Sequence, residues 1–165
     1  MTIREYKGSF KGLKMCFIGD GNNMANSLMV GALKTGMKFS IACPEGYTPD
    51  AQLTEWAKEY GDDFEVTTDV KKAAKDADVL YTDVWASMGQ EEEKALREKA
   101  FRNYRINAEV MECAKKDAMV LHCLPAHRGE EITEDVLEAH ADEVFDEAEN
   151  RLHAQKAVMC KLLRD

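Results

Sequence analysis

The chain has 165 residues, 45% of them hydrophobic, which suits one domain with a single core rather than two. Its 22 basic and 31 acidic residues give a formal net charge of −9 and form no basic stripe, which argues against nucleic acid or an anionic membrane surface as a partner. No apolar run approaches the roughly 20 residues of a membrane-spanning helix, and the start lacks the apolar core of a signal peptide. Five well-separated cysteines predict reduced thiols, so we expect a cytoplasmic protein that binds a small molecule.

Short apolar runs alternate with helical patterns along the whole chain. The apolar runs predict buried strands at residues 14–19, 38–43, 64–67, 79–82, 119–123 and 143–145. The helical patterns between and after them cover residues 24–35, 50–60, 70–75, 91–104, 107–114, 133–140 and 151–163. This alternation predicts an α/β fold, a Rossmann-like three-layer αβα sandwich with a mostly parallel sheet. No repeat or linker divides the chain, so residues 1–165 are expected to form one domain.

Four polar segments leave the predicted strands and should meet at one edge of the sheet. They are Gly-Asp-Gly-Asn-Asn at 19–23, Asp-Val-Trp-Ala-Ser-Met-Gly at 83–89, His-Cys-Leu-Pro at 122–125 and Asp-Glu-Ala-Glu-Asn-Arg at 146–151. In open parallel sheets, ligands bind outside the carboxyl ends of the strands, near the point where the strand order reverses. We therefore expect the binding site among these segments.

The first segment occupies the place of a dinucleotide-binding glycine motif, but its third glycine is replaced, which argues against a nicotinamide or flavin cofactor. Asn22 or Asn23 caps the next helix, and the free N–H groups of that helix end favour an anion. Two adjacent asparagines exceed what one cap needs, so capping and ligand contact both remain open.

Asp83 follows a buried strand, so its carboxylate either grips an ammonium group at the sheet edge or caps the next turn. Ser87 and Gln90 have the spacing of a capping box, which alone accounts for both residues. Gly89 beside Met88 supplies the backbone freedom of a loop that closes over a ligand.

Cys123 ends a strand, and its thiol faces either a ligand or the core, where cysteines are usually inert. His122 and His127 lie nearby in the sequence, but the ligand set of a metal site is incomplete, so we expect no metal. Arg151 is predicted in the first turn of a helix, where a cation opposes the helix dipole. Its partner is then either a nearby glutamate, Glu147 or Glu149, or an anionic ligand.

Taken together, these segments resemble the ornithine carbamoyltransferase family across nearly the whole chain, in the family's order and spacing. The resemblance implies transfer of the carbamoyl group of carbamoyl phosphate to the side-chain amine of L-ornithine, which gives L-citrulline and phosphate in arginine metabolism, without a cofactor. It also implies that Asn23 and Asp83 hold the α-carboxylate and α-ammonium of ornithine, and that Ser87 and Met88 belong to a loop that closes over it. This loop favours ornithine over aspartate, putrescine or an acetylated ornithine.

The resemblance further places Cys123 at the reacting centre with the backbone of Leu124, and Arg151 on carbamoyl phosphate. An alkylammonium with a pKa of about 10 is no nucleophile, so the site must create the free amine and stabilise an oxyanion. Cys123 as the proton acceptor and Arg151 as the polarising cation are hypotheses that suit this need.

The Ser-Thr-Arg-Thr and His-Pro-x-Gln motifs of the family's other half do not occur in this sequence. We therefore expect an ornithine-binding domain, part of a longer protein, whose carbamoyl-phosphate domain is absent and which is inactive alone. The complete family enzyme is a homotrimer or a multiple of one. Two alternatives remain, a non-catalytic amino-acid-binding module and, less favoured, a nucleotide-binding Rossmann domain.

Overall fold

A computed structural model describes residues 1–86 and 93–164 of the chain. Its centre is a five-stranded sheet in the order β3-β2-β1-β4-β5, and every neighbouring pair of strands is parallel. The strands are β1 (Lys14–Ile18), β2 (Lys38–Ala42), β3 (Phe64–Thr67), β4 (Val79–Thr82) and β5 (Met119–His122). The predicted parallel α/β sheet is therefore confirmed.

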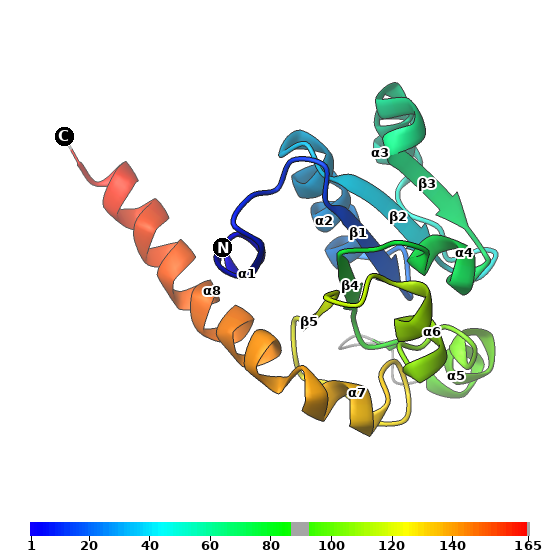
Figure 1. The fold of residues 1–165 in the computed structure, drawn as a ribbon. Helices are drawn as coiled ribbons and strands as arrows, with labels where there is room; N and C mark the ends of the chain where they lie inside the picture. The colour runs from blue at the N-terminus through cyan, green and yellow to red at the C-terminus, as the bar shows by residue number, and fades with distance from the viewer. Residues whose placement is uncertain (87–92, 165) are drawn as a thin grey trace.

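Helices flank the sheet on both faces, as Figure 1 shows. On one side lie α1 (Thr2–Lys7), α2 (Asn23–Lys34), α3 (Ala51–Ala57) and the 3-10 helix η1 (Lys58–Asp63). On the other lie α4 (Val70–Ala74), α6 (Ala108–Cys113) and α7 (Glu134–Ala139). The helix α5 (Lys94–Phe101) follows the fourth strand, and the long helix α8 (Ala141–Leu162) runs past the edge at β5.

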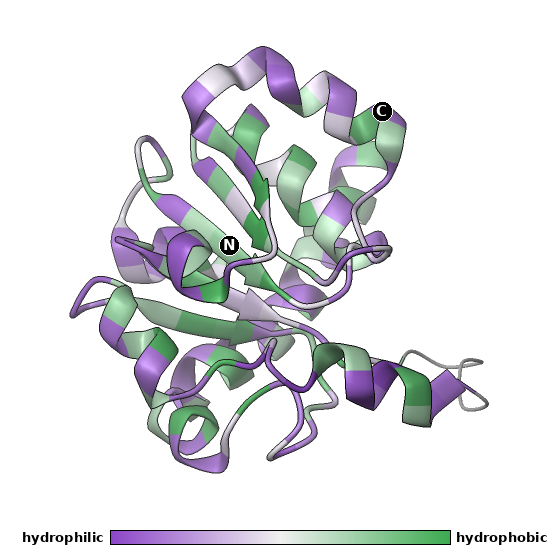
Figure 2. Ribbon diagram, turned by 90° about the vertical axis from the view of Figure 1, so that its right-hand side faces the viewer, coloured by the Kyte–Doolittle hydropathy of each residue, from purple (hydrophilic) through white to green (hydrophobic). Residues whose placement is uncertain are grey.

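Each face of the sheet has its own apolar core, because buried parallel strands carry apolar side chains in both directions. Phe17, Phe39 and Tyr81 face α2 and α3, whereas Ile18 and Leu80 face α4, α6 and α7. Figure 2 shows the hydrophobic strands between helices on which hydrophobic and hydrophilic residues alternate. This is the three-layer arrangement that the strand–helix alternation predicts.

The predicted sixth strand at residues 143–145 and the predicted helix start near residue 151 are both wrong. Both segments belong to α8, which begins at Ala141 and ends at Leu162. Val144 is buried and Phe145 is 64% exposed, so one turn of this helix imitates the alternating burial of a strand.

Where the sequence predicted a sixth strand, side chains from the amino-terminal part of α8 form hydrogen bonds with the edge of the sheet. β5 is an edge strand, and its backbone N–H groups at Val120 and His122 donate to the carboxylates of Glu143 and Glu147, at 2.7 and 3.0 Å. Two residues along a strand span about 6.6 Å. Four residues along a helix span about 6 Å, so the two spacings match. The helix thereby covers an edge that would otherwise expose unpaired donors.

No helix within the described ranges is both long enough and apolar enough to cross a membrane. The outer part of α8 nevertheless carries exposed apolar side chains, with Met159 at 54% and Leu162 at 78% exposure. This part of the helix extends away from the sheet in Figure 1.

Candidate functional site

The strand order reverses between β1 and β4, so the carboxyl ends of these two neighbouring strands frame the expected binding position. The segment after β1 packs closely against residues 47–49. A Cβ on Gly21 would lie 2.2 Å from the backbone nitrogen of Pro49, and the N–H of Gly21 donates to the Tyr47 carbonyl at 2.8 Å. Only glycine fits this approach, so this glycine is required by packing rather than by a nucleotide phosphate.

Asn22, not Asn23, caps α2 and also fixes Asp83. Its side-chain oxygen accepts from the N–H groups of Met24 and Ala25 at 2.9 and 3.2 Å, while its amide nitrogen donates to Asp83 Oδ2 at 3.0 Å. Asn23 is the first residue of α2 and is exposed. Its side chain has no hydrogen bond to the described residues, so it is free to contact a ligand beside Asp83.

Cys123 lies against the same carboxylate. Its thiol donates to Asp83 Oδ1 at 3.1 Å, and the N–H of Val84 donates to the same oxygen at 2.8 Å. Burial raises the pKa of the Cys123 thiol well above its usual range, and the charge of Asp83 raises that pKa further. Cys123 is therefore a thiol that orients Asp83, not a resting thiolate.

This arrangement predicts slow alkylation of Cys123. At pH 8, iodoacetamide should label the exposed Cys160 fully while Cys123 stays largely unmodified, because the thiolate is the reactive form. Asp83→Asn removes the neighbouring negative charge and should accelerate labelling of Cys123 without changing Cys160. Peptide mass spectrometry over a time course measures both rates, and equal rates in the unaltered chain would contradict the assignment.

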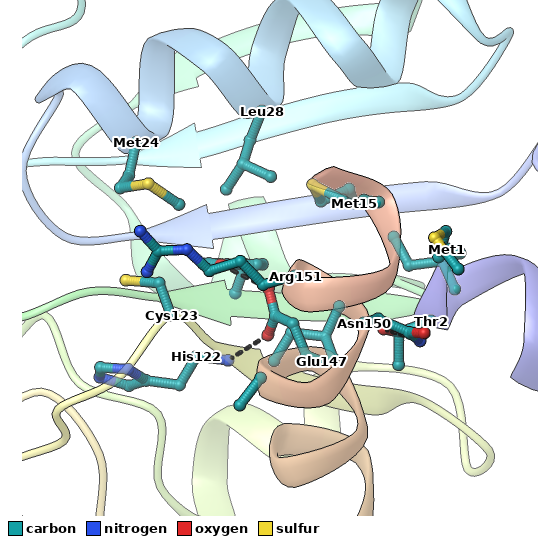
Figure 3. A pocket seen from close by; sticks show the side chains of 15 residues that line it. Met1, Thr2, Met15, Met24, Leu28, His122, Cys123, Glu147, Asn150 and Arg151 are labelled. Atoms are coloured by element: carbon teal, nitrogen blue, oxygen red, sulfur yellow. Dashed lines mark hydrogen bonds between the residues drawn. The ribbon is translucent and has the colours of Figure 1, made fainter. Parts of the chain in front are cut away.

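A cavity of about 500 Å³ lies between α8, α2 and the sheet, and Cys123 and Arg151 both line it. Figure 3 shows the Arg151 side chain extending from α8 toward Cys123, with Met24 of α2 beside it. Arg151 is exposed and lies in the middle of α8, so the expected conflict with the helix dipole does not exist. The structure instead brings Arg151 to the cavity through the length of this helix.

Neither of the glutamates suggested as partners pairs with Arg151 in the described part of the chain. Glu147 accepts from the Tyr81 hydroxyl at 2.6 Å and from the N–H of His122, and Glu149 lies 3.1 Å from His153. Burial raises the pKa of both Glu147 and Tyr81, and the Glu147 carboxylate raises the pKa of Tyr81 further. Arg151 therefore has no carboxylate from these two residues, which leaves it available to an anionic ligand.

The turn after β5 rests on a buried histidine that sequence reasoning named only as a possible metal ligand. His122 Nδ1 accepts from the N–H of Leu124 at 2.9 Å, so Nε2 carries a proton and donates to Glu131 Oε1 at 3.0 Å. Both side chains are fully buried. Leu124 has a φ of 53°, a left-handed conformation that is uncommon for a leucine. His122 thus holds the backbone of Leu124, which follows Cys123 at the cavity.

Among the described residues, one group of three has the spacing for a metal ion, namely His127, Glu130 and Glu131. Glu131 Oε1 already accepts from His122 and from the N–H of His127 at 2.6 Å. These bonds favour a structural network over a metal centre, and the expectation of no metal remains a prediction.

Sequence reasoning missed an ion pair at the carboxyl ends of the strands. Arg97 of α5 is 7% exposed and binds Asp20, which follows β1, at 2.7 Å. The Trp85 carbonyl accepts from the same guanidinium at 2.9 Å, and the ring of Tyr47 lies 5.2 Å from it. The partners are 77 positions apart, so no local pattern pointed to them. The predicted ligand residues Ser87 and Met88 lie outside the described residues.

The profile of the aspartate/ornithine carbamoyltransferase family, Asp/Orn binding domain, matches residues 11–162. An ornithine carbamoyltransferase of Methanosarcina mazei is 55% identical over 164 residues, which cover 99% of this chain and 54% of that protein. The anabolic ornithine carbamoyltransferase of Pyrococcus furiosus is 53% identical over 167 residues, covering 99% of this chain and 53% of that protein.

Solved structures agree with the sequence matches. The ornithine carbamoyltransferase of Pyrococcus furiosus superposes with a TM-score of 0.87 over 96% of this chain and 52% of that one, at 53% identity. The anabolic enzyme of Campylobacter jejuni gives a TM-score of 0.91 over 98% of this chain and 55% of that one, at 43% identity. The chain thus spans about half the length of the relatives that it matches.

Proposed function

The chain belongs to the aspartate/ornithine carbamoyltransferase family as its Asp/Orn-binding domain, and from that premise we propose that it supplies the ornithine side of an ornithine carbamoyltransferase active site. The complete enzyme would transfer the carbamoyl group of carbamoyl phosphate to the side-chain amine of L-ornithine and release L-citrulline and phosphate. The observation that carries the proposal is Asp83, which Asn22 and Cys123 hold at the point where the strand order reverses.

Recognition of the amino-acid end of ornithine follows from charge. The Asp83 carboxylate suits the α-ammonium, and its hydrogen bonds from Asn22, Cys123 and the N–H of Val84 fix its orientation before the ligand arrives. The amide of Asn23 has no hydrogen bond to the described residues and lies at the positive end of a 12-residue helix, so it suits the α-carboxylate. Ser87 and Met88, by the family resemblance, complete the contacts from the loop that follows β4.

The transfer step requires that the side-chain ammonium lose a proton and that the carbamoyl oxygen be stabilised. Cys123 is protonated without substrate, so its role as proton acceptor requires a nearby cation to lower the pKa of the thiol. The bound ammonium and Arg151 of the same cavity supply such charge. We assign Arg151 and the backbone of Leu124 to carbamoyl phosphate, with Arg151 polarising the carbonyl oxygen.

Calorimetric titration of this chain with L-ornithine, with and without carbamoyl phosphate, tests the binding site directly. We expect weak binding, because the other half of the site is missing, and a loss of affinity of roughly tenfold or more in Asp83→Ala. Asp62→Ala, an exposed carboxylate of η1, is the matched control and should leave the affinity unchanged. Equal binding by Asp83→Ala and the control would contradict the assignment of Asp83.

A chimaera tests catalysis. The part of the Methanosarcina mazei relative that lies outside its matched residues would be joined to this chain, and citrulline production would be measured. We expect activity in the chimaera and none in the chain alone, together with assembly into a trimer or a multiple of one. A correctly assembled chimaera that binds ornithine but makes no citrulline would favour the non-catalytic amino-acid-binding module. An unchanged rate and pH profile in Cys123→Ser would remove Cys123 from the reacting centre.

A further inference from the structure

A second concave surface lies apart from the ornithine site, between the start of α4 and the segment that joins α5 to α6. It encloses about 470 Å³. We call it the 102–107 groove, and it is lined by Val70, Lys71, Arg102, Asn103, Arg105, Asn107, Glu109 and Val110. Because α4 follows the carboxyl end of β3, the groove lies at the edge of the sheet where ligands of this fold class bind.

The groove is cationic in a chain whose formal net charge is −9. Three of its residues are basic and one is acidic. The acidic residue, Glu109, is already paired with Lys71 at 2.9 Å. Arg102 and Arg105 have no carboxylate within ion-pair distance in residues 1–86 and 93–164, so the local positive charge is not neutralised by the described chain.

Arg105 is the most constrained of these cations. Its guanidinium lies over the ring of Trp85, 5.8 Å from the ring centroid, and Trp85 is itself 3% exposed. Its Nε is buried and has no hydrogen-bond partner in the described part of the chain. A buried donor without an acceptor costs free energy, and the stacked guanidinium keeps its remaining N–H groups in a fixed plane. Arg105 therefore lines the groove with its guanidinium held over Trp85 and with one N–H donor that lacks an acceptor in the described part of the chain.

We propose that the 102–107 groove binds a small multivalent oxyanion of the phosphate class, held by Arg105 and Arg102. A planar guanidinium offers paired donors that match phosphate oxygens. The side-chain amides of Asn103 and Asn107 add neutral donors, since Asn107 uses its oxygen to cap α6 at the N–H of Val110. The net negative charge of the chain and the presence of Glu109 in the groove disfavour nucleic acid as the occupant.

Trp85 provides the readout. The chain has two tryptophans, so Trp56→Phe leaves Trp85 as the single indole reporter. Titration with pyrophosphate at constant ionic strength should give a saturable change in Trp85 emission. Arg102→Gln, which leaves the Arg105 guanidinium over the Trp85 ring in place, should weaken binding roughly tenfold. Arg164→Gln makes the same charge change at the far end of the chain and should leave the affinity unchanged.

Calorimetry with pyrophosphate is the second measurement, because Arg105→Gln alters the surroundings of the reporter itself. It should show binding in the unaltered chain and none in Arg105→Gln. A lack of saturable binding by both methods, or equal weakening by Arg102→Gln and Arg164→Gln, would overturn the proposal, since the latter would indicate general charge screening. Ornithine takes no part in these measurements, so their result is independent of the proposed function.

Discussion

Glu147→Leu should lower the free energy of unfolding of this chain by roughly 2–6 kcal/mol, because the change leaves two buried donors without an acceptor. These donors are the Tyr81 hydroxyl and the N–H of His122. Arg151 lies one turn further along α8, so its position depends on how that helix packs against β5. Urea denaturation followed by circular dichroism measures the stability change.

Two further variants show whether the effect comes from these hydrogen bonds. Tyr81→Phe removes one of the two donors. It should therefore lower the free energy of unfolding less in the Glu147→Leu background than in the unaltered chain. Glu149→Leu changes an exposed glutamate of the same helix and should leave stability nearly unchanged. Strict additivity of the Tyr81 and Glu147 substitutions would show that their hydrogen bond does not support the fold.

The pH dependence of the Glu147 effect has a defined sign. Burial raises the pKa of Glu147 in the folded state above its unfolded value of about 4.3. The folded chain then holds this proton more tightly, so the contribution of Glu147 to stability is greatest below that value. It declines as the pH rises through the raised pKa. The stability difference between the unaltered chain and Glu147→Leu should therefore shrink over this interval.

The central sheet could be predicted from the sequence because its five strands carry strong local signals. Apolar runs of four to five residues end at polar turns, and the helices between them have regular apolar stripes and caps. The prediction for residues 143–145 was wrong because buried Val144, between half-buried Glu143 and exposed Phe145, fits either a strand or one helical turn. Tertiary contacts select the helix, because the carboxylates of Glu143 and Glu147 match the spacing of the N–H donors on β5.

The residues of the candidate site that directly follow strands could be predicted from the sequence. The contacts between residues far apart in the sequence could not. Asp83 and Cys123 follow adjacent parallel strands, so their proximity follows from topology, and their hydrogen bond is consistent with it. The choice of Asn22 as the cap is a matter of backbone geometry that two adjacent asparagines conceal. The Asp20–Arg97 pair joins segments with no shared local pattern.

His122→Leu should reduce the free energy of unfolding by roughly 2–4 kcal/mol, because it removes an N–H donor from the buried Glu131 carboxylate and the acceptor of the Leu124 N–H. Adding Glu131→Gln should recover part of this loss, since a neutral amide is less costly to bury than a carboxylate that has lost one of its two donors. His153→Leu, which changes an exposed histidine of α8, is the control and should have little effect.

The same pair of variants separates stability from positioning. His122→Leu with Glu131→Gln still lacks the acceptor for the Leu124 N–H, so the left-handed backbone of Leu124 loses a restraint. In the chimaera, this double variant should therefore remain impaired in citrulline production at a temperature where it is fully folded, with kcat reduced more than ornithine affinity. Recovery of stability together with full activity would show that His122 contributes only to stability and that Leu124 keeps its position without His122.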